Sequence, residues 1–346
     1  MRSADKILIR ALGGERLEVP PIWLMRQAGR YLPEYRQVRG EAGSFLDLCY
    51  TPKFAEEVTL QPIRRYGFDA SIVFSDILVV PDGLGQKVWF EEGAGPRLAP
   101  LANGQDVAAL RLDQMVGHLA PVYETIARLT SSLPAETCLI GFAGAPWTVA
   151  TYMIAGQGSP DQAAARLWAY QREADFERLM ALLVEATVQH LSSQIEAGAE
   201  AVQLFDSWAG SLPEAAFRRW VLAPTQEIVT QLRAVHPDVP IIGFPRHVGP
   251  LYEIFAKEAG VQGVSVDTAL PVGWAASHVQ AHVCVQGNLD PLALVAGGEA
   301  LRQGVAEILA GFGGGPFVFN LGHGIVPQTP PEHVGQLIDL IRNGCS

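Results

Sequence analysis

Two arginines four residues apart, Arg26 and Arg30, are the groups in this 346-residue sequence whose chemistry is easiest to interpret. They follow an apolar stretch at residues 21–24 that is typical of a buried strand, so they leave a sheet at its carboxyl edge. Gly29 between them frees the backbone for a turn or for a nest of N–H groups. Because guanidinium groups keep their charge and bind carboxylates through two hydrogen bonds, the pair predicts a site for an anion. The alternative is a pair of surface arginines at the start of a helix.

Other polar residues follow later apolar runs. Asp76 comes after the run at residues 72–74, so its carboxylate is expected in poorly hydrated surroundings, where it needs a partner such as an arginine or a ligand N–H group. His323 lies between two glycines, on exposed and permissive backbone that favours a functional role. Tyr152 is expected in a loop whose small neighbours let its hydroxyl reach a ligand, and Ser207 ends another run. For any one such residue, capping of a strand or helix is the ordinary alternative.

Short apolar runs alternate with amphipathic stretches along the chain. The runs predict eight strands, at residues 21–26, 70–77, 138–144, 201–207, 240–246, 263–268, 283–290 and 317–324. The stretches predict helices at residues 53–66, 121–133, 161–197, 213–236, 250–260, 272–281, 291–312 and 331–343. This order favours an α/β fold, a (β/α)8 TIM barrel forming a single domain over residues 1–346, with a hairpin inserted after strand two at residues 79–101. An open doubly wound sheet is the alternative, but it predicts a GxGxxG loop after strand one, which is absent.

Composition excludes several classes of protein. The formal net charge of −11 argues against a nucleic-acid or anionic-membrane partner. The four cysteines, Cys49, Cys138, Cys284 and Cys345, have no metal-binding spacing and fit a reducing compartment, so a soluble cytoplasmic protein is expected. No run of about 18 apolar residues is long enough to span a bilayer.

Five segments in order, at residues 25–36, 74–85, 141–156, 204–210 and 319–329, resemble the uroporphyrinogen decarboxylase family. The resemblance implies a (β/α)8 barrel that acts as a homodimer without metal or organic cofactor. It also implies conversion of the four acetate side chains of uroporphyrinogen III to methyl groups, with release of carbon dioxide, on the way to haem and related tetrapyrroles. Such a substrate carries eight carboxylates and four pyrrole N–H groups.

The resemblance implies roles for the candidate residues. Carboxylates would be bound by Arg26, Arg30 and the backbone N–H groups of Gln27, Ala28 and Gly29, while Asp76 would accept the pyrrole N–H groups and stabilise the cation formed in the reaction. Tyr152 and Ser207 would bind acetate or propionate groups, and His323 would close the far side. The proton donor, Arg26 or His323, stays open at this stage.

Two rival functions also stay open. Methyltransferases of the same fold family hold zinc through His-x-Cys and a later Cys, and neither Arg246-His247 nor the segment around His323 has such a cysteine. A tetrapyrrole carrier would keep the arginines without needing Asp76 and Tyr152. Incubation with the reduced macrocycle and assay for carbon dioxide separates carrier from enzyme.

Overall fold

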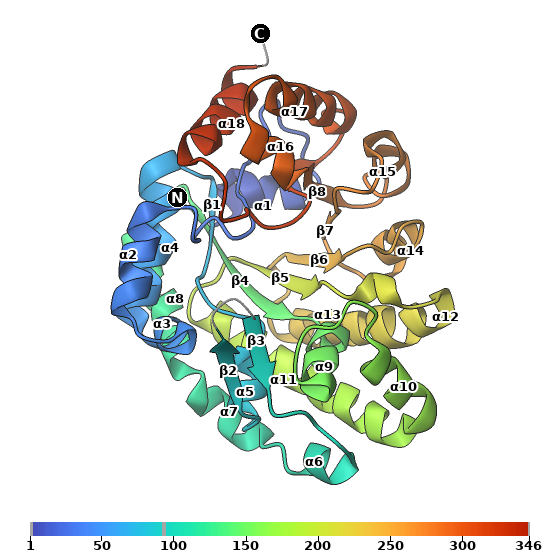
Figure 1. Ribbon diagram of the computed structural model, residues 1–346. Coiled ribbons are helices and arrows are strands. Elements are labelled where there is room, and N and C mark those ends of the chain that lie inside the picture. Colours follow the sequence, from blue (N-terminus) through green and yellow to red (C-terminus); the bar gives the residue numbers. More distant parts are fainter. Residues whose placement is uncertain (1–2, 92–94, 345–346) are drawn as a thin grey trace.

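A curled parallel sheet forms the centre of the protein (Figure 1). The computed structural model describes residues 3–91 and 95–344. Seven strands are hydrogen-bonded in the order β1-β4-β5-β6-β7-β8-β9, and every pairing is parallel. Their bounds are β1 (Ala70–Ile72), β4 (Cys138–Gly144), β5 (Ala201–Asp206), β6 (Ile241–Pro245), β7 (Gly263–Ser265), β8 (Cys284–Leu289) and β9 (Phe317–Leu321).

The first predicted strand, at residues 21–26, is wrong as a strand. Only Ile22 forms a bridge, parallel to Phe319 of β9. The Phe319 N–H donates to the Pro21 carbonyl at 2.9 Å, and on the other side the Asp69 N–H donates to the Ile22 carbonyl at 3.0 Å. The segment therefore hydrogen-bonds to the last strand and to the residue before the first strand, but it turns away at residues 24–27 before a ladder can extend.

A second sheet contains two antiparallel strands, β2 (Val88–Glu91) and β3 (Gly95–Leu98), with Val88 opposite Leu98. Residues 92–94, which include Glu92 and Gly93 of the expected hairpin, lie outside the described residues. The start of the expected hairpin was wrong, because residues 79–83 form a helix instead. Arg97 makes an isolated antiparallel bridge to Gln157, which places β3 beside the segment that follows Tyr152.

Helices lie around the outside of the curled sheet (Figure 1). Their bounds are α1 (Ile7–Leu12), α2 (Pro33–Glu41), α3 (Phe45–Tyr50), α4 (Pro52–Tyr66), α5 (Val79–Gly83), α6 (Gly104–Ala108), α7 (Leu112–His118), α8 (Ala120–Ser132), α9 (Pro146–Ala155), α10 (Ala163–Gln171), α11 (Glu173–Glu196), α12 (Glu214–Phe217), α13 (Ala223–Val235), α14 (Leu251–Glu258), α15 (Val272–His278), α16 (Pro291–Ala296), α17 (Gly298–Phe312) and α18 (Pro331–Asn343), with short 3-10 helices η1 (Ser3–Asp5) and η2 (Ala209–Ser211) and the π-helix η3 (Arg218–Leu222).

Three predicted helices are divided in the structure. The stretch at residues 161–197 forms α10 and α11, and the stretch at residues 213–236 contains the π-helix η3 between α12 and α13. The third, at residues 291–312, is interrupted by Gly297 and Gly298, whose φ angles of 65° and 54° lie in the left-handed region. A helix cannot continue through that conformation, so α16 ends and α17 begins there.

The interior of the sheet is closed at one end by α1. Leu8 and Leu12 of this helix are buried in a cluster with Trp23 and Phe244. A buried polar chain accompanies them, in which the Trp23 Nε1 donates to Gln286 Oε1 at 2.8 Å and the Gln286 Nε2 donates to Gln203 Oε1 at 3.0 Å. The interior is thus filled by side chains, and the strand ends at the opposite edge are left to carry a site.

The cysteines of the described residues, Cys49, Cys138 and Cys284, are free and buried, and Cys345 lies outside the described residues. Within residues 3–91 and 95–344, no helix is both long and apolar enough to cross a membrane.

Candidate active site

Arg26 stands in a tight turn at the end of the segment that bridges to β9. The Gln27 N–H donates to the Leu24 carbonyl at 3.0 Å, and Arg26 itself has a φ of 60°, a conformation that usually belongs to glycine. Two further bonds hold the turn: the Met25 N–H donates to Asn320 Oδ1 at 3.0 Å and the Ile325 N–H donates to the Met25 carbonyl at 2.9 Å. The surrounding segments therefore impose an unfavourable backbone conformation on Arg26, and its side chain is exposed.

The residues that follow Arg26, at positions 27–30, differ in burial and in hydrogen bonding. The Gln27 side chain is buried, and it accepts from the Leu24 N–H and donates to the Ala70 carbonyl of β1. Because the Gln27 N–H donates within the turn, it cannot take part in the expected N–H nest. The N–H groups of Ala28 and Gly29 remain for it, since they have no backbone partner among the described residues. A Cβ on Gly29 would lie 2.9 Å from the Arg26 carbonyl oxygen, so only glycine fits there. The Arg30 side chain is exposed.

Asp76 follows β1 and is half-buried. Its Oδ1 accepts from the Leu78 N–H at 2.8 Å, which fixes the carboxyl at the start of α5. Burial raises the pKa of Asp76 to about 6, and the Leu78 N–H and the charge of Arg26 limit that rise. The electrostatic effect of Arg26 on the carboxyl means that the structure brings these two predicted residues together.

Tyr152 lies in α9, not in the expected loop. Its ring is 6.3 Å from the Trp208 ring, centroid to centroid. Burial raises the pKa of Tyr152, the charge of Asp76 adds to the rise and the charge of Arg26 opposes it. Tyr152 therefore belongs to the same group as Asp76 and Arg26. Ser207 directly follows β5 and is half-buried beside Trp208.

A buried acid at the end of β5, Asp206, joins α9 to the loop after β5. Asp206, 4% exposed, accepts from the Thr148 Oγ1–H at 2.5 Å, and Thr148 Oγ1 accepts from the Trp208 N–H at 3.1 Å. Asp206 Oδ2 has no hydrogen-bond partner among the described residues. Burial raises the pKa of Asp206 to about 7, and hydrogen bonds from Thr148 oppose the rise. The contact joins α9, which carries Tyr152, to the loop that carries Ser207.

Glycines hold the loops at this edge in close contact. A Cβ on Gly324 would collide with the Arg26 side chain, and one on Gly210 would collide with the His247 backbone. A Cβ on Gly322 would collide with the Thr268 backbone in the same way. The loops that follow β5, β6, β7 and β9 therefore touch one another and the Arg26 turn, so the residues they carry form one group.

His323, between two of these glycines, is partly exposed and surrounded by positive charge. Burial, together with the charges of Arg246, Arg26 and His247, lowers the pKa of His323 to about 3, opposed only by Asp267. The imidazole is therefore neutral at pH 7 in the free protein. Arg246 is the residue of this group that sequence reasoning did not include in the site, although its place at the end of a predicted strand was a usable signal.

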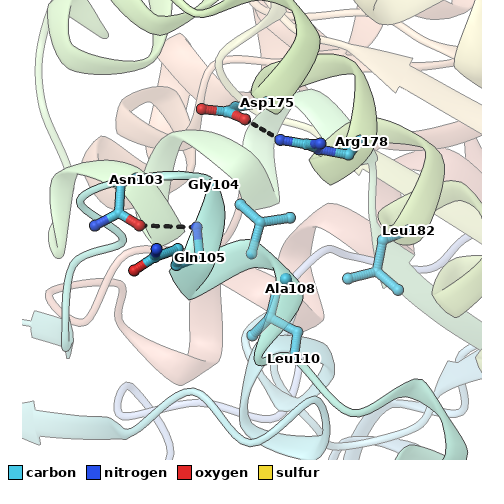
Figure 2. A pocket seen from close by; sticks show the side chains of 9 residues that line it. Asn103, Gly104, Gln105, Ala108, Leu110, Asp175, Arg178 and Leu182 are labelled. Carbon is cyan, nitrogen blue, oxygen red and sulfur yellow. Dashed lines mark hydrogen bonds and ion pairs between the residues drawn. The ribbon is translucent and has the colours of Figure 1, made fainter.

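Several residues and one large cavity lie outside this arrangement. Asp290 caps α16 by accepting from the Leu292 N–H, and His190 is buried against the Tyr123 hydroxyl, so both have structural roles. A groove of about 910 Å³ lies between α6 and α11, and none of the predicted site residues lines it (Figure 2). Its residues are Asn103, Gly104, Gln105, Val107, Ala108, Leu110, Asp175, Arg178 and Leu182. In the described part of the chain, no group of three or more His, Cys, Asp or Glu side chains could hold a metal ion.

The geometry thus combines unpaired guanidinium groups with a carboxyl that titrates near neutral pH. The cationic groups can bind carboxylates, and ionised Asp76 can accept N–H donors or stabilise a cation. Tyr152 and the free N–H groups of Ala28 and Gly29 add donors for anionic oxygens. Such an arrangement of groups can bind a ligand that carries both acidic groups and N–H donors.

Comparison with known proteins gives one consistent family. The uroporphyrinogen decarboxylase family matches residues 3–344. The uroporphyrinogen decarboxylase of Rhodospirillum rubrum is 57% identical over 340 residues, covering 98% of both chains, and that of Paracoccus denitrificans is 54% identical, covering 98% of this chain and 99% of the relative. Among solved structures, a methyltransferase from Methanosarcina mazei superposes with a TM-score of 0.81 at 18% identity over 97% of each chain, a likeness that concerns the fold alone.

Proposed function

Because this chain belongs to the uroporphyrinogen decarboxylase family, we propose that the residues around Arg26 and Asp76 form the site that binds and decarboxylates the tetrapyrrole. The chain is a carboxy-lyase of tetrapyrrole biosynthesis that converts the four acetate side chains of uroporphyrinogen III to methyl groups, giving coproporphyrinogen III and carbon dioxide. The observation that carries the assignment of the site is the contact of the loops after β7 and β9 with each other and with the Arg26 turn, where the charge of Arg26 acts on Asp76.

The proposed binding mode separates the two kinds of polar group on the substrate. Arg26, Arg30 and the N–H groups of Ala28 and Gly29 bind carboxylates at the edge of the macrocycle, whereas Asp76 accepts the pyrrole N–H groups at its centre. Tyr152 and Ser207 donate hydroxyl groups to acetate or propionate oxygens, and His323 lies across the site from Asp76. N–H donors favour the ionised form of Asp76, so substrate binding itself lowers the pKa of that carboxyl.

The chemistry follows from where the electrons go. Protonation of the ring carbon adjacent to the one that bears the acetate converts the pyrrole to a cation that is conjugated with the acetate methylene. The bond between the acetate methylene and its carboxylate then breaks, carbon dioxide leaves and the electron pair returns to the ring system. A second proton converts the methylene to a methyl group, and the first proton leaves the ring carbon, which restores the neutral pyrrole. Ionised Asp76 stabilises the cation as it develops, and preorganised charge of this kind is commonly the largest catalytic contribution.

Proton delivery is assigned to Arg26 rather than His323. With a pKa of about 3 in the free protein, His323 carries no proton to give at pH 7. The charge of Arg26 acts on Asp76 and its side chain is exposed, so the guanidinium can donate a proton to the ring carbon through a bound water molecule and regain a proton from solvent. His323 then serves as a neutral hydrogen-bonding group.

Further parts of the proposal concern architecture. The hydrogen bonds of residues 21–23 to both ends of the sheet support a closed eight-stranded barrel in a single domain, and β2 and β3 support a hairpin inserted after β1. The family supports a homodimer in the cytoplasm that needs no metal or organic cofactor.

The test is substitution of Asp76 by Ala, with carbon dioxide release from uroporphyrinogen III as the assay. Turnover should fall by at least about 100-fold, the usual effect of removing a group that stabilises charge in the transition state. Asp339→Ala, which removes an exposed carboxylate from α18, is the matched control and should leave turnover unchanged. Activity of Asp76→Ala within a few-fold of the parent would remove Asp76 from the mechanism, and binding without carbon dioxide release by the parent protein would indicate a carrier.

A further inference from the structure

The end of β6 carries a guanidinium group without a protein partner. The backbone of Arg246 is fixed on both sides, because its N–H donates to the Asp206 carbonyl and its carbonyl accepts from the Gly210 N–H, each at 3.0 Å. Its side chain, in contrast to its backbone, is not held by hydrogen bonds from residues that the structure describes. The Nε is buried with no hydrogen-bond partner, and no ion pair involving this guanidinium occurs within the described residues. A buried donor without an acceptor is unfavourable by about 1–3 kcal/mol, so it indicates a partner that the protein itself does not supply.

Asp267 is the carboxylate that acts electrostatically on Arg246, but its oxygens are already bound. Its Oδ2 accepts from the His247 N–H and from the Tyr252 hydroxyl, each at 2.8 Å, and its Oδ1 accepts from the Ala269 N–H at 2.9 Å. These bonds fix the loops after β6 and β7 and leave the Arg246 charge without an ion-pair partner.

Arg246 belongs to a group of basic side chains, which we call the basic rim and define as Arg26, Arg246, His247 and His323; its positive charge comes from the two arginines. Gly324 contacts Arg26, and Gly322 of the same loop contacts Thr268. Because Asp267, the neighbour of Thr268, accepts from the His247 N–H at 2.8 Å, the loops that carry these four residues touch one another. The charge of Arg26 lowers the pKa of Arg246 in addition to burial, so the two guanidinium groups repel each other. Asp267 is the carboxylate near these groups, and its oxygens are bound to the His247 N–H, the Tyr252 hydroxyl and the Ala269 N–H, with the His247 ring 3.7 Å away. In a protein of net charge −11, two guanidinium groups that repel each other form a site suited to an anion.

We propose that Arg246 is a further substrate-binding arginine, which holds one side-chain carboxylate of the tetrapyrrole on the β6 side of the site. The proposal rests on the proposed function, since the macrocycle supplies the carboxylate. A carboxylate bound there gives the Arg246 Nε its missing acceptor and separates the charges of Arg246 and Arg26. It also stands near His323, so the imidazole gains proton affinity once the ligand is bound.

The test compares Arg246→Gln and Arg246→Lys with the parent enzyme. Arg246→Gln should raise the KM for uroporphyrinogen III by about 10- to 100-fold, the range expected for loss of one charge-assisted hydrogen-bonded contact, with kcat within a few-fold. Arg246→Lys keeps the charge but not the paired donors, so its KM should lie between that of the parent and that of Arg246→Gln. Arg64→Gln, which removes the same charge from the outer helix α4, is the matched control and should leave KM unchanged.

Direct binding of reduced coproporphyrinogen III identifies which carboxylate Arg246 holds. If Arg246→Gln weakens this binding as much as it raises KM, the carboxylate is a propionate, which the product retains; if product binding is unchanged, it is an acetate. Both results support the proposal. In both variants, near-parent unfolding temperatures are expected because the side chain makes no hydrogen bond that could be lost.

NMR titration of the His323 imidazole supplies a second measurement. Its pKa should rise in ligand-free Arg246→Gln, since the substitution removes a nearby positive charge, and should stay unchanged in Arg64→Gln. A KM for Arg246→Gln within two-fold of the parent value would overturn the proposal. Failure of the proposed function is recognised separately, because it appears as an active Asp76→Ala enzyme.

Discussion

The ionisation of Asp76 should set the acid limb of the pH profile. Its pKa of about 6 is raised mainly by burial, and only the ionised carboxylate can accept pyrrole N–H groups and stabilise the ring cation. At pH 7 about nine-tenths of the free enzyme then carries the charge, and at pH 5 about one-tenth does, so kcat/KM should fall about ten-fold between these values. A carboxyl with the ordinary value near 3.8 would lose almost nothing over that range.

The perturbation that identifies the group is removal of the charge on Arg26. Because a nearby cation favours the ionised carboxylate, Arg26→Gln should raise the pKa of Asp76 and move the acid limb to higher pH, by less than about 1 pH unit, since burial is the larger cause. Arg26→Lys keeps the charge, so the acid limb of its pH profile should lie at the same pH as in the parent even though turnover falls. The comparison of the two profiles separates the electrostatic role of Arg26 from its role in proton delivery.

The assay is anaerobic carbon dioxide release from uroporphyrinogen III between pH 5 and 8, with kcat/KM taken from initial rates. The carboxyl groups of the substrate titrate in all variants alike and so cancel in the comparison. His323→Asn should keep the acid limb, because the pKa of His323, about 3, lies below the range studied. Loss of the limb in His323→Asn, or identical limbs in Arg26→Gln and Arg26→Lys, would refute the assignment of the limb to Asp76.

Three further substitutions test other contacts of the site. Gly324→Ala places a methyl group against the flexible Arg26 side chain, so kcat/KM should fall while the unfolding temperature changes little; Gly335→Ala on α18, where the added Cβ meets nothing, is its control in the same two assays. Asp206→Asn should be more stable than the parent above pH 7. The pKa of Asp206 is about 7 in the folded protein and 3.8 for an unperturbed Asp, so the parent loses up to about 4 kcal/mol of stability as pH rises from about 4 to 7. Thermal unfolding measured across that range should show no such loss in the variant. Tyr152→Phe removes one donor to a carboxylate and should lower kcat/KM by about ten-fold, measured at pH 7 beside the unchanged unfolding temperature that a retained ring predicts.

Sequence patterns predicted the strands of the sheet well because parallel strands are buried on both faces and read as apolar runs. The strands β4 and β5 agree with their predicted ranges to within a residue. The segment at residues 21–26 is equally apolar but forms only a bridge, because the Asn320 side chain and the Ile325 N–H bind Met25 and turn the chain. That contact joins residues nearly 300 positions apart, so no local pattern could reveal it.

The site was predictable where a residue type alone limits its role. Arg26, Asp76 and His323 were identified because charge after an apolar run or between glycines has few structural uses, and the structure brings Arg26 near both of the others. The protonation states were not predictable. His323 has the intrinsic pKa of a proton donor, and only its burial and the arrangement of Arg246 and Arg26 around it show that it is neutral in the free protein. Arg246 itself was missed because its significance lies in lacking a partner, which is a property of three-dimensional packing.

The arginines have a role in catalysis as well as in binding, which follows from the charge that the substrate brings. Each carboxylate entering the site raises the pKa of Asp76, since like charges disfavour ionisation, and an unpaired set of them would leave that carboxyl protonated at pH 7. A carboxylate paired with a guanidinium group contributes little field at Asp76, because the two opposite charges largely cancel at a distance. Arg26, Arg30 and Arg246 therefore allow a polyanionic substrate to bind beside a carboxylate that must remain ionised, and the pyrrole N–H groups then favour that ionised state. In the described part of the free protein these arginines have no carboxylate partner, so they are available to pair with the carboxylates of the substrate.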